Sequence, residues 1–415
     1  MEIYVYGLGH VGLPLACWIA LSGKKVFGID IDAKVIDDIK NGKITIEENY
    51  HDTHIKTLAQ ALVFEDKLIL NTALTRLSPE PAVFLISVGL ADRPDGSKDL
   101  SPILAVIDEI GRALVPQDLI ILRSTMTPGI CQNVIAPRLE QFNISFHLAY
   151  CPETIIETKA FAELEDNPLI LSGIDEESYR LAEAFMRSIS SNHIYRASNM
   201  QTAEMAKVVQ NIYRDVNIAF ANEIRDAADH LNIDFDELQA LVNVNPRVAL
   251  HNAGPGVGGY CLPNALCYLQ GAFEDREDLL PLAKTARALN RHQPEKIVRQ
   301  ATNALAAIGK KPDEASVAVV GLAMKSYCAD LRFSPALEII EILQRNKVKV
   351  RAFDPMIPTV YPFQASSFEA CIDGADCLII TAKQRGLDFN RADIAARMAP
   401  SPIIIDTQSA ISKFC

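Results

Sequence analysis

Residues 1–30 read MEIYVYGLGHVGLPLACWIALSGKKVFGID, and this stretch decides the fold. The apolar run 3–6 leads straight into a glycine turn, a helical stretch follows to about Ser22, and a second strand ends at Asp30. Three glycines in the turn have the GxGxxG spacing: Gly7, Gly9 and Gly12. This spacing permits a tight turn, close approach of the backbone to a pyrophosphate, and close packing of helix on strand. The stretch therefore predicts the start of a Rossmann-like domain.

Asp30 indicates which dinucleotide this domain binds. It ends the second strand, eighteen residues after Gly12. An acid at this place accepts hydrogen bonds from the adenosine ribose, which favours NAD over NADP. A glycine turn without a ligand is the alternative. The strands and the acid around the turn favour the nucleotide.

The rest of the chain predicts two α/β regions with helices between them. Apolar runs, mostly separated by helical patterns, lie at 82–89, 118–125, 145–153 and 168–174. Four more apolar runs lie at 316–323, 348–355, 376–382 and 402–408. Strands that alternate with helices argue for parallel sheets covered on both faces. We expect two doubly wound Rossmann-like domains joined by a helical region, with boundaries at 1–198, 199–308 and 309–415.

A long helix begins at about Met200, because more than thirty residues follow without glycine or proline. Apolar residues along it step by three and four: Met205, Val208, Ile212, Val216 and Ala219. This periodicity predicts an amphipathic helix.

Composition excludes several classes of protein. The chain has 415 residues and a net charge of −12, which opposes binding to nucleic acid and to anionic membranes. The apolar run 11–21 is too short to span a bilayer, and no basic segment precedes it. Nine cysteines without a CxxC pair predict neither a disulfide framework nor a zinc site, and we interpret HDTH (51–54) as surface. The expected location is the cytoplasm.

Cys261 lies in GPGVGGYCLPNA (254–265), a glycine-rich loop. A cysteine is usually a small buried hydrophobe, but here the backbone can come close to a ligand. We therefore interpret Cys261 as a nucleophile. Lys207 and Asn211 lie four apart on the long helix, with Glu204 three residues earlier. They are either a solvated polar stripe or a pair that stabilises a developing oxyanion.

Eight motifs spread over nearly the whole chain resemble the UDP-glucose/GDP-mannose dehydrogenase family of NAD-dependent nucleotide-sugar 6-dehydrogenases. They are GLGHVGLPLA (7–16), DGSKDLS (95–101), STMTPG (124–129), CPET (151–154), AEMAKVVQNIYRDVNIAFANEI (203–224), GPGVGGYCLP (254–263), VVGLAMKSYCADLRFSPALEII (319–340) and FDP (353–355). The GPGVGG form looks like the branch that acts on UDP-N-acetylhexosamines. Such enzymes serve polysaccharide biosynthesis.

The resemblance implies oxidation of a sugar C6 alcohol to a carboxylate with two NAD+, through a thiohemiacetal and a thioester on the cysteine. By position, Cys261 is the nucleophile and Lys207 and Asn211 stabilise the oxyanion. Glu153 serves in acid/base work or water activation, and Thr125 helps to hold the water. A covalent intermediate divides a hard oxidation into easier steps.

The resemblance also implies binding residues and a homodimer. The NAD site is expected at Gly7, Gly9, His10, Val11, Gly12, Asp30, Val88, Ser124 and Thr125. The UDP-sugar is expected at Arg247, Gly258, Lys325 and Arg332, with Arg247 reaching it across a dimer formed through the 201–232 helix. Ordinary surface charge is the alternative for these basic residues.

Three positions depart from the family pattern. The family has an aspartate four residues after the cysteine, where this chain has Ala265. Thr158 stands where glycine is usual, and Gln408 stands where many members have arginine. Loss of one group that orients water can cost orders of magnitude in a hydrolytic step.

Four alternatives to the UDP-N-acetylhexosamine dehydrogenase stay open from the sequence. They are a UDP-glucose 6-dehydrogenase, an enzyme that stalls at the aldehyde or thioester, a nucleotide-sugar-binding protein without turnover, and a 3-hydroxy acid dehydrogenase. Cys261 and the second α/β region argue against the last.

Overall fold

The computed structural model describes residues 1–93, 97–273, 276 and 278–411. The chain divides into two compact units: unit 1 consists of Met1–Gln210 and Cys267–Glu277, and unit 2 of Asn211–Leu266 and Asp278–Cys415. Asp95 and Gly96, which open the DGSKDLS motif, lie outside the described residues. The three-domain division stays a prediction.

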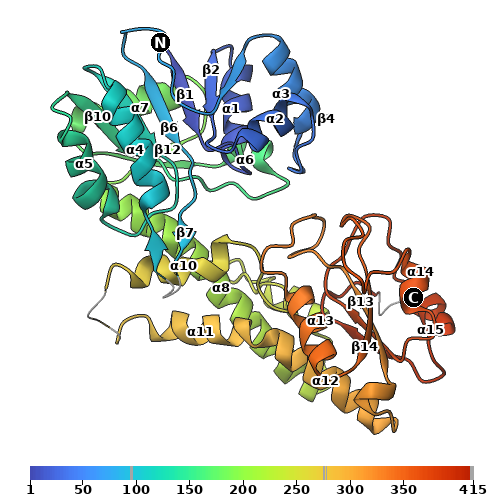
Figure 1. Ribbon diagram of the computed structural model, residues 1–415. Helices are drawn as coiled ribbons and strands as arrows, with labels where there is room; N and C mark the ends of the chain where they lie inside the picture. The colour runs from blue at the N-terminus through green and yellow to red at the C-terminus, as the bar shows by residue number, and fades with distance from the viewer. Residues whose placement is uncertain (94–96, 274–275, 277, 412–415) are drawn as a thin grey trace. The chain divides into compact units, whose positions relative to one another are not determined.

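Unit 1 is built on an eight-stranded sheet. In spatial order its strands are β12 (Ile194–Arg196), β11 (Leu169–Gly173), β10 (Phe146–Tyr150), β9 (Asp118–Leu122), β6 (Val83–Ile86), β1 (Ile3–Tyr6), β2 (Val26–Ile29) and β5 (Leu68–Asn71). Its helices are α1 (Gly12–Leu21), α2 (Ala33–Lys40), α3 (Ile55–Phe64), α4 (Ser101–Ala113), α5 (Ala136–Glu140), α6 (Ala160–Asp166) and α7 (Glu176–Arg187). The central strands are buried throughout because helices cover both faces (Figure 1).

One strand pair of this sheet departs from the predicted parallel arrangement. β10 and β11 are antiparallel, whereas the other pairs in the sheet are parallel. The segment between them contains only the short helix α6 and does not return the chain to the amino ends of the strands. The chain therefore enters β11 from the carboxyl edge, and residues 151–157 stay at that edge.

Unit 2 contains a second, smaller parallel sheet, with strand order β14 (Lys349–Phe353), β13 (Ser316–Val320), β15 (Cys377–Ile380) and β16 (Ile403–Asp406). Val317 and Val319 pack with α12 (Gln293–Ala307) and α13 (Pro335–Arg345) on one face. Ala318 and Val320 pack with α14 (Phe368–Ile372) and α15 (Arg391–Arg397) on the other. Alternate side chains of one strand thus serve two cores, as expected of a doubly wound sheet.

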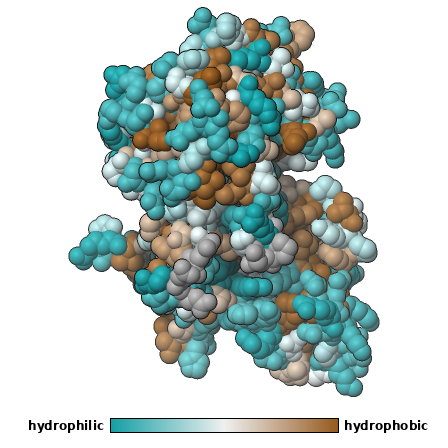
Figure 2. Space-filling model, turned by 60° about the vertical axis from the view of Figure 1, so that its left-hand side comes forward, coloured by the Kyte–Doolittle hydropathy of each residue, from teal (hydrophilic) through white to brown (hydrophobic). Residues whose placement is uncertain are grey.

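The long helix is α8 (Met200–His230), as the sequence predicts. Val208 and Ala219 are buried, whereas Met205 of the same apolar series is exposed. The remaining helices include α9 (Phe235–Val242), α10 (Cys261–Gln270) and α11 (Pro281–Arg291). On the face seen in Figure 2, hydrophilic residues cover much of the surface and leave apolar patches between them.

Candidate active site

The glycine loop of unit 1 lies at the switch point of its sheet. β1 lies between β2 and β6, so the strand order reverses where β1 ends. A Cβ on Gly12 would come within 1.7 Å of the Gly7 carbonyl oxygen, and Gly7 has φ +81. A Cβ on Gly9 would meet nothing within 4 Å. Gly7 and Gly12 are thus required by the turn and the packing, while Gly9 leaves open space beside the start of α1.

Asp30 and the other predicted NAD residues in unit 1 gather at this edge. Asp30 Oδ2 accepts a hydrogen bond from the Leu8 N–H at 2.8 Å, which fixes the acid beside the loop. Ser124 Oγ donates to the Val88 carbonyl at 2.6 Å, joining the ends of β6 and β9. The residues present therefore fit a dinucleotide: an open glycine cradle, a helix that begins at the cradle, and an anchored acid for the ribose.

His10, in the middle of the glycine loop, makes a polar contact that the sequence did not predict. Its Nδ1 lies 2.9 Å from Glu157 Oε1. Glu157 follows the CPET motif, so this pair links the nucleotide loop to the segment that carries Glu153. Both segments belong to unit 1.

Glu153 is held by a buried arginine that sequence reasoning missed. The Arg123 side chain is 1% exposed, and its Nη2 donates to Glu153 Oε2. Glu153 Oε1 accepts from the backbone N–H groups of Thr154 at 2.8 Å and Ile155 at 3.2 Å. Burial lowers the pKa of Arg123, but its electrostatic and hydrogen-bond interactions with Glu153 and Cys151 outweigh that effect and leave it raised. The carboxylate is thus fixed in one orientation by three donors.

Thr158 shows why glycine is usual at its position. Its φ is +76, in the left-handed region that a β-branched side chain rarely adopts. The Thr158 N–H donates to Glu48 Oε1 at 2.5 Å, and the Ala160 N–H donates to Glu48 Oε2 at 2.9 Å. Burial raises the pKa of Glu48, although these two hydrogen bonds oppose the shift. A buried carboxylate thus holds the backbone that follows Glu153 in a strained conformation.

Lys207 and Asn211 are 8% and 6% exposed, so the solvated polar stripe is wrong for them. Glu204, on the same helix, accepts from the Gly129 N–H at 2.5 Å and the Cys131 N–H at 2.8 Å, which fastens the STMTPG turn. Burial raises the pKa of Glu204. Lys207, Glu153 and Thr125 belong to unit 1, whereas Asn211 and Cys261 belong to unit 2, so a common site for them stays a prediction.

In unit 2, the glycines before Cys261 pack against the loop that follows β13. The Gly259 N–H donates to the Arg332 carbonyl at 2.8 Å. A Cβ on Gly258 would lie 2.7 Å from the Phe333 carbonyl oxygen and 2.9 Å from Met324 Cβ. This close approach brings the predicted Gly258 and Arg332 together, with Lys325 on the same loop. The loop follows β13, which lies between β14 and β15, so it too sits at a switch point.

Cys261 is exposed and is the first residue of α10. Ala265 lies one helical turn further and is 1% exposed. Gln408 follows β16, and its Oε1 lies 3.4 Å from Ser326 Oγ of the loop after β13. Ala265 and Gln408, two of the departures from the family pattern, therefore lie beside the cysteine loop and the loop after β13.

Arg332, Arg247 and His54 make contacts that are ordinary for surface residues. The Arg332 guanidinium pairs with Asp330 at 2.5 Å. The Arg247 side chain is exposed, and it forms no ion pair with another of the described residues. His54 lies 3.4 Å from Glu47, and the described residues contain no group of three that could hold a metal. In the described part of the chain, no helix has the length and apolar character needed to cross a membrane.

The fold and the nucleotide loop define a dinucleotide-binding protein with two doubly wound sheets. Three sequence matches refine this class: residues 1–194 match the NAD binding domain, 201–292 the central domain and 318–413 the UDP binding domain of one family. The chain belongs to the UDP-glucose/GDP-mannose dehydrogenase family. It uses NAD and takes a UDP-sugar as substrate.

Individual relatives are similar over their whole length. The UDP-N-acetyl-D-mannosamine dehydrogenase of Pyrococcus horikoshii is 33% identical over 419 residues, covering 100% of this chain and 96% of that protein. A UDP-N-acetyl-D-mannosamine dehydrogenase of Methanococcus maripaludis is 30% identical, with 99% and 93% covered. The solved Pyrococcus horikoshii structure has a TM-score of 0.91 at 33% identity and 100% and 96% coverage. That of the Staphylococcus aureus UDP-N-acetyl-mannosamine dehydrogenase has 0.85 at 28%, also with 100% and 96% covered.

Proposed function

We propose that the chain oxidises the C6 alcohol of UDP-N-acetylmannosamine to the carboxylate, with two NAD+ per sugar. The observation that carries this proposal is full-length similarity to proteins that are named as UDP-N-acetylmannosamine dehydrogenases. The packing of the cysteine loop against the loop of Lys325 and Arg332 supports it, because one unit then presents both a nucleophile and cations for a diphosphate.

Cys261 supplies the sulfur in this proposal. Its thiolate adds to the C6 aldehyde to give a thiohemiacetal, and the same sulfur then carries the sugar as a thioester. NAD+, when bound, supplies the hydride acceptor for both oxidations. Lys207 and Asn211 are buried one turn apart on α8, where a cation and an amide donor stabilise an oxyanion more strongly than in water.

Glu153 takes the proton of the water that hydrolyses the thioester, and Thr125 holds this water. Arg123 and two backbone N–H groups keep the Glu153 carboxylate in one orientation. A general base must be placed within hydrogen-bond reach of the proton it accepts, so a fixed orientation favours this role.

We further propose a homodimer through the 201–232 helix. Large apolar side chains stand exposed on α8 and just beyond it in unit 2: Tyr213, Phe220, Leu231, Ile233, Leu241 and Val244. An exposed apolar set of this kind is typical of an interface. Arg247 lies close to it in the sequence, and we propose that it reaches the UDP-sugar of the partner. The described cysteines are free, which supports a reducing cytoplasm.

Ala265 favours a second candidate, an enzyme impaired in thioester hydrolysis. Alanine at this buried position of α10 neither accepts a proton nor orients water. Such an enzyme would form the Cys261 adduct and then stall, and mass spectrometry after mixing with NAD+ and the UDP-sugar would detect the adduct.

The test is NADH production with UDP-glucose, UDP-N-acetylglucosamine and UDP-N-acetylmannosamine. We expect steady NADH production with UDP-N-acetylmannosamine, whereas Cys261→Ala, which should still bind NAD, should form no uronate. Faster NADH production with UDP-glucose would show that UDP-glucose, and not UDP-N-acetylmannosamine, is the substrate. UDP-sugar binding measured by calorimetry, without NADH from any sugar, would reject an enzyme in favour of a binding protein.

A further inference from the structure

Two side chains one turn apart on α8 contact two different loops of unit 2. The first is Asn222, which is 3% exposed. Its Oδ1 accepts from the N–H of Gly254, the first glycine of the cysteine loop, at 2.9 Å. Its Nδ2 donates to Asn290 Oδ1 at 3.3 Å. Asn222 thus joins the start of the cysteine loop to helix α11.

Asn290 extends this contact into a buried polar network. Its Nδ2 donates to the Asp215 carbonyl at 2.8 Å and to Asp215 Oδ1 at 2.9 Å. Arg287 Nη1 donates to the same carboxylate at 2.8 Å. Burial raises the pKa of Asp215, and Arg287 and Asn290 oppose the shift. The Asn290 amide that fixes Asn222 is therefore itself held by Asp215 of α8, and Arg287 of α11 holds the Asp215 carboxylate.

The second side chain is Arg225, which contacts the loop after β16. Its Nη1 donates to the Thr407 carbonyl at 3.0 Å, and its Nη2 donates to Ser409 Oγ at 3.4 Å. Ser409 has φ +51, and its Oγ donates to Asp236 Oδ1 of α9 at 2.6 Å. Two elements thus hold the residues on either side of Gln408.

These two loops meet where the substrate is expected. A Cβ on Gly254 would lie 3.4 Å from Gln408 Nε2, and Gln408 Oε1 faces Ser326 of the loop that carries Lys325. A buried polar group that loses its partner destabilises the protein, so a network of this kind keeps one arrangement of its loops.

We propose that Asn222 and Arg225 are positioning residues, which set the cysteine loop and the Gln408 loop at the spacing that the UDP-sugar requires. The inference rests on the proposed function, since it assigns these loops to the substrate site. Neither side chain takes part in the chemistry. Each acts through the backbone that it holds, Asn222 on Gly254 and Arg225 on Thr407.

The same region supplies a matched control. Asn222, Arg225, Gly254 and Thr407 line a pocket of about 460 Å³ together with Asp226 and Lys296. Asp226 follows Arg225 on α8, but its carboxylate accepts a hydrogen bond from Lys296 of α12 and not from either loop. Asp226→Asn therefore changes a charge in the same pocket and leaves both loop contacts in place.

The test compares Asn222→Ala, Arg225→Gln and Asp226→Asn in the full chain. Hydrogen exchange in the substrate-free protein should become at least tenfold faster for the peptide containing 254–260 in Asn222→Ala, because the Gly254 N–H loses its acceptor. We expect both loop variants to raise KM for UDP-N-acetylmannosamine at least tenfold, with a smaller change in kcat. The Kd of NAD should stay within twofold, and Asp226→Asn should match the parent.

A conservative variant separates positioning from general stability. Asn222→Asp keeps an oxygen for the Gly254 N–H but loses the donor to Asn290 Oδ1, so exchange at 254–260 should stay slow and most of the KM should be restored although the protein is less stable. Unchanged exchange at 254–260, or faster exchange with an unchanged KM, would overturn the inference. If the parent oxidises no UDP-sugar, the proposed function fails, while the exchange result still reports on the loop contact.

Discussion

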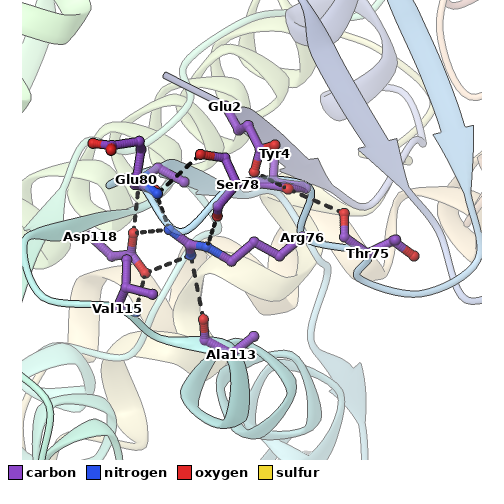
Figure 3. A network of polar contacts seen from close by, with 10 residues as sticks. Glu2, Tyr4, Thr75, Arg76, Ser78, Glu80, Ala113, Val115 and Asp118 are labelled. Atoms are coloured by element: carbon purple, nitrogen blue, oxygen red, sulfur yellow. Dashed lines mark hydrogen bonds and ion pairs between the residues drawn. The ribbon is translucent and has the colours of Figure 1, made fainter.

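Strand β9 has an arginine–carboxylate pair with a buried carboxylate at each end, and the two pairs differ in how many of their polar atoms have a hydrogen-bond partner. At its amino end, Asp118 accepts two hydrogen bonds from Arg76 at 2.8 and 2.9 Å and two more from backbone N–H groups (Figure 3). Arg76 also donates to the carbonyls of Ser78, Glu80 and Ala113. At the carboxyl end, Arg123 pairs with Glu153 and Cys151, but its buried Nε has no partner among the described residues.

The difference separates stability from function along one strand. A fully satisfied pair joins the amino ends of the sheet, where no predicted site residue lies. An incompletely satisfied pair lies at the carboxyl edge, where ligands bind in open α/β sheets. Buried polar groups left unpaired in a native protein call for an explanation, and a functional site is one.

Glu153→Gln should show the largest effect on function. It removes the proposed base while leaving an oxygen for Arg123, so steady NADH production should fall by about 10²–10⁴-fold. The protein should also lose stability, because the buried guanidinium of Arg123 loses its counter-charge. The rate per folded molecule and the thermal unfolding curve measure the two effects. Retention of more than half of the activity would show that Glu153 is not the base.

Arg76→Ala should show the opposite profile. The Asp118 carboxylate is fully buried, so loss of its partner should lower the free energy of unfolding by about 3–5 kcal/mol. Activity per folded molecule should stay unchanged, because the change lies at the other end of β9. Denaturant unfolding and active-site titration measure this, and a specific loss of NADH production would break the comparison.

Ala265→Asp should sharpen the account of thioester hydrolysis. It restores the family carboxylate one turn beyond Cys261 and should speed thioester hydrolysis by up to about 10²-fold. Some stability should be lost, because a charge enters a buried position. Rapid-quench measurement of the Cys261 adduct checks the rate. An unchanged rate would mean that the remaining groups already suffice.

Thr158→Gly should show the smallest effect, on stability alone. Relief of the left-handed threonine should raise the free energy of unfolding by about 1 kcal/mol, part of the strain being offset by glycine's extra freedom in the unfolded chain. Asn143 also has a positive φ, +54, and Asn143→Gly is the control. Asparagine tolerates this conformation, so the control should change little. Equal gains in both variants would argue against strain at Thr158.

Local sequence patterns predicted much of the fold and part of the site. The glycine spacing, Asp30, the apolar runs and the uninterrupted long helix each express a local requirement, and the structure bears out the two doubly wound sheets. The glycines before Cys261 also predicted a close approach of backbone for the same reason, since Gly258 and Gly259 lie close to another loop.

Contacts between residues far apart in the chain could not be predicted from the sequence. Nothing near Arg123 indicates that it pairs with a glutamate thirty residues away, and Asn222 looks like any polar residue on a helix. The antiparallel β10–β11 pair depends on the edge of the sheet at which the chain lies after α6. Strand patterns in the sequence do not encode this edge. The strain at Thr158 could be suspected only from the family's glycine.

The central claim is that Cys261 binds the sugar covalently after the first oxidation, carries it through the second and then releases it. The most direct measurement is the amount of NADH formed per UDP-N-acetylmannosamine consumed. The account predicts two NADH per sugar, with free uronate and an unmodified Cys261 at the end. A single burst of at most two NADH per active site, with the adduct retained on Cys261, would contradict it.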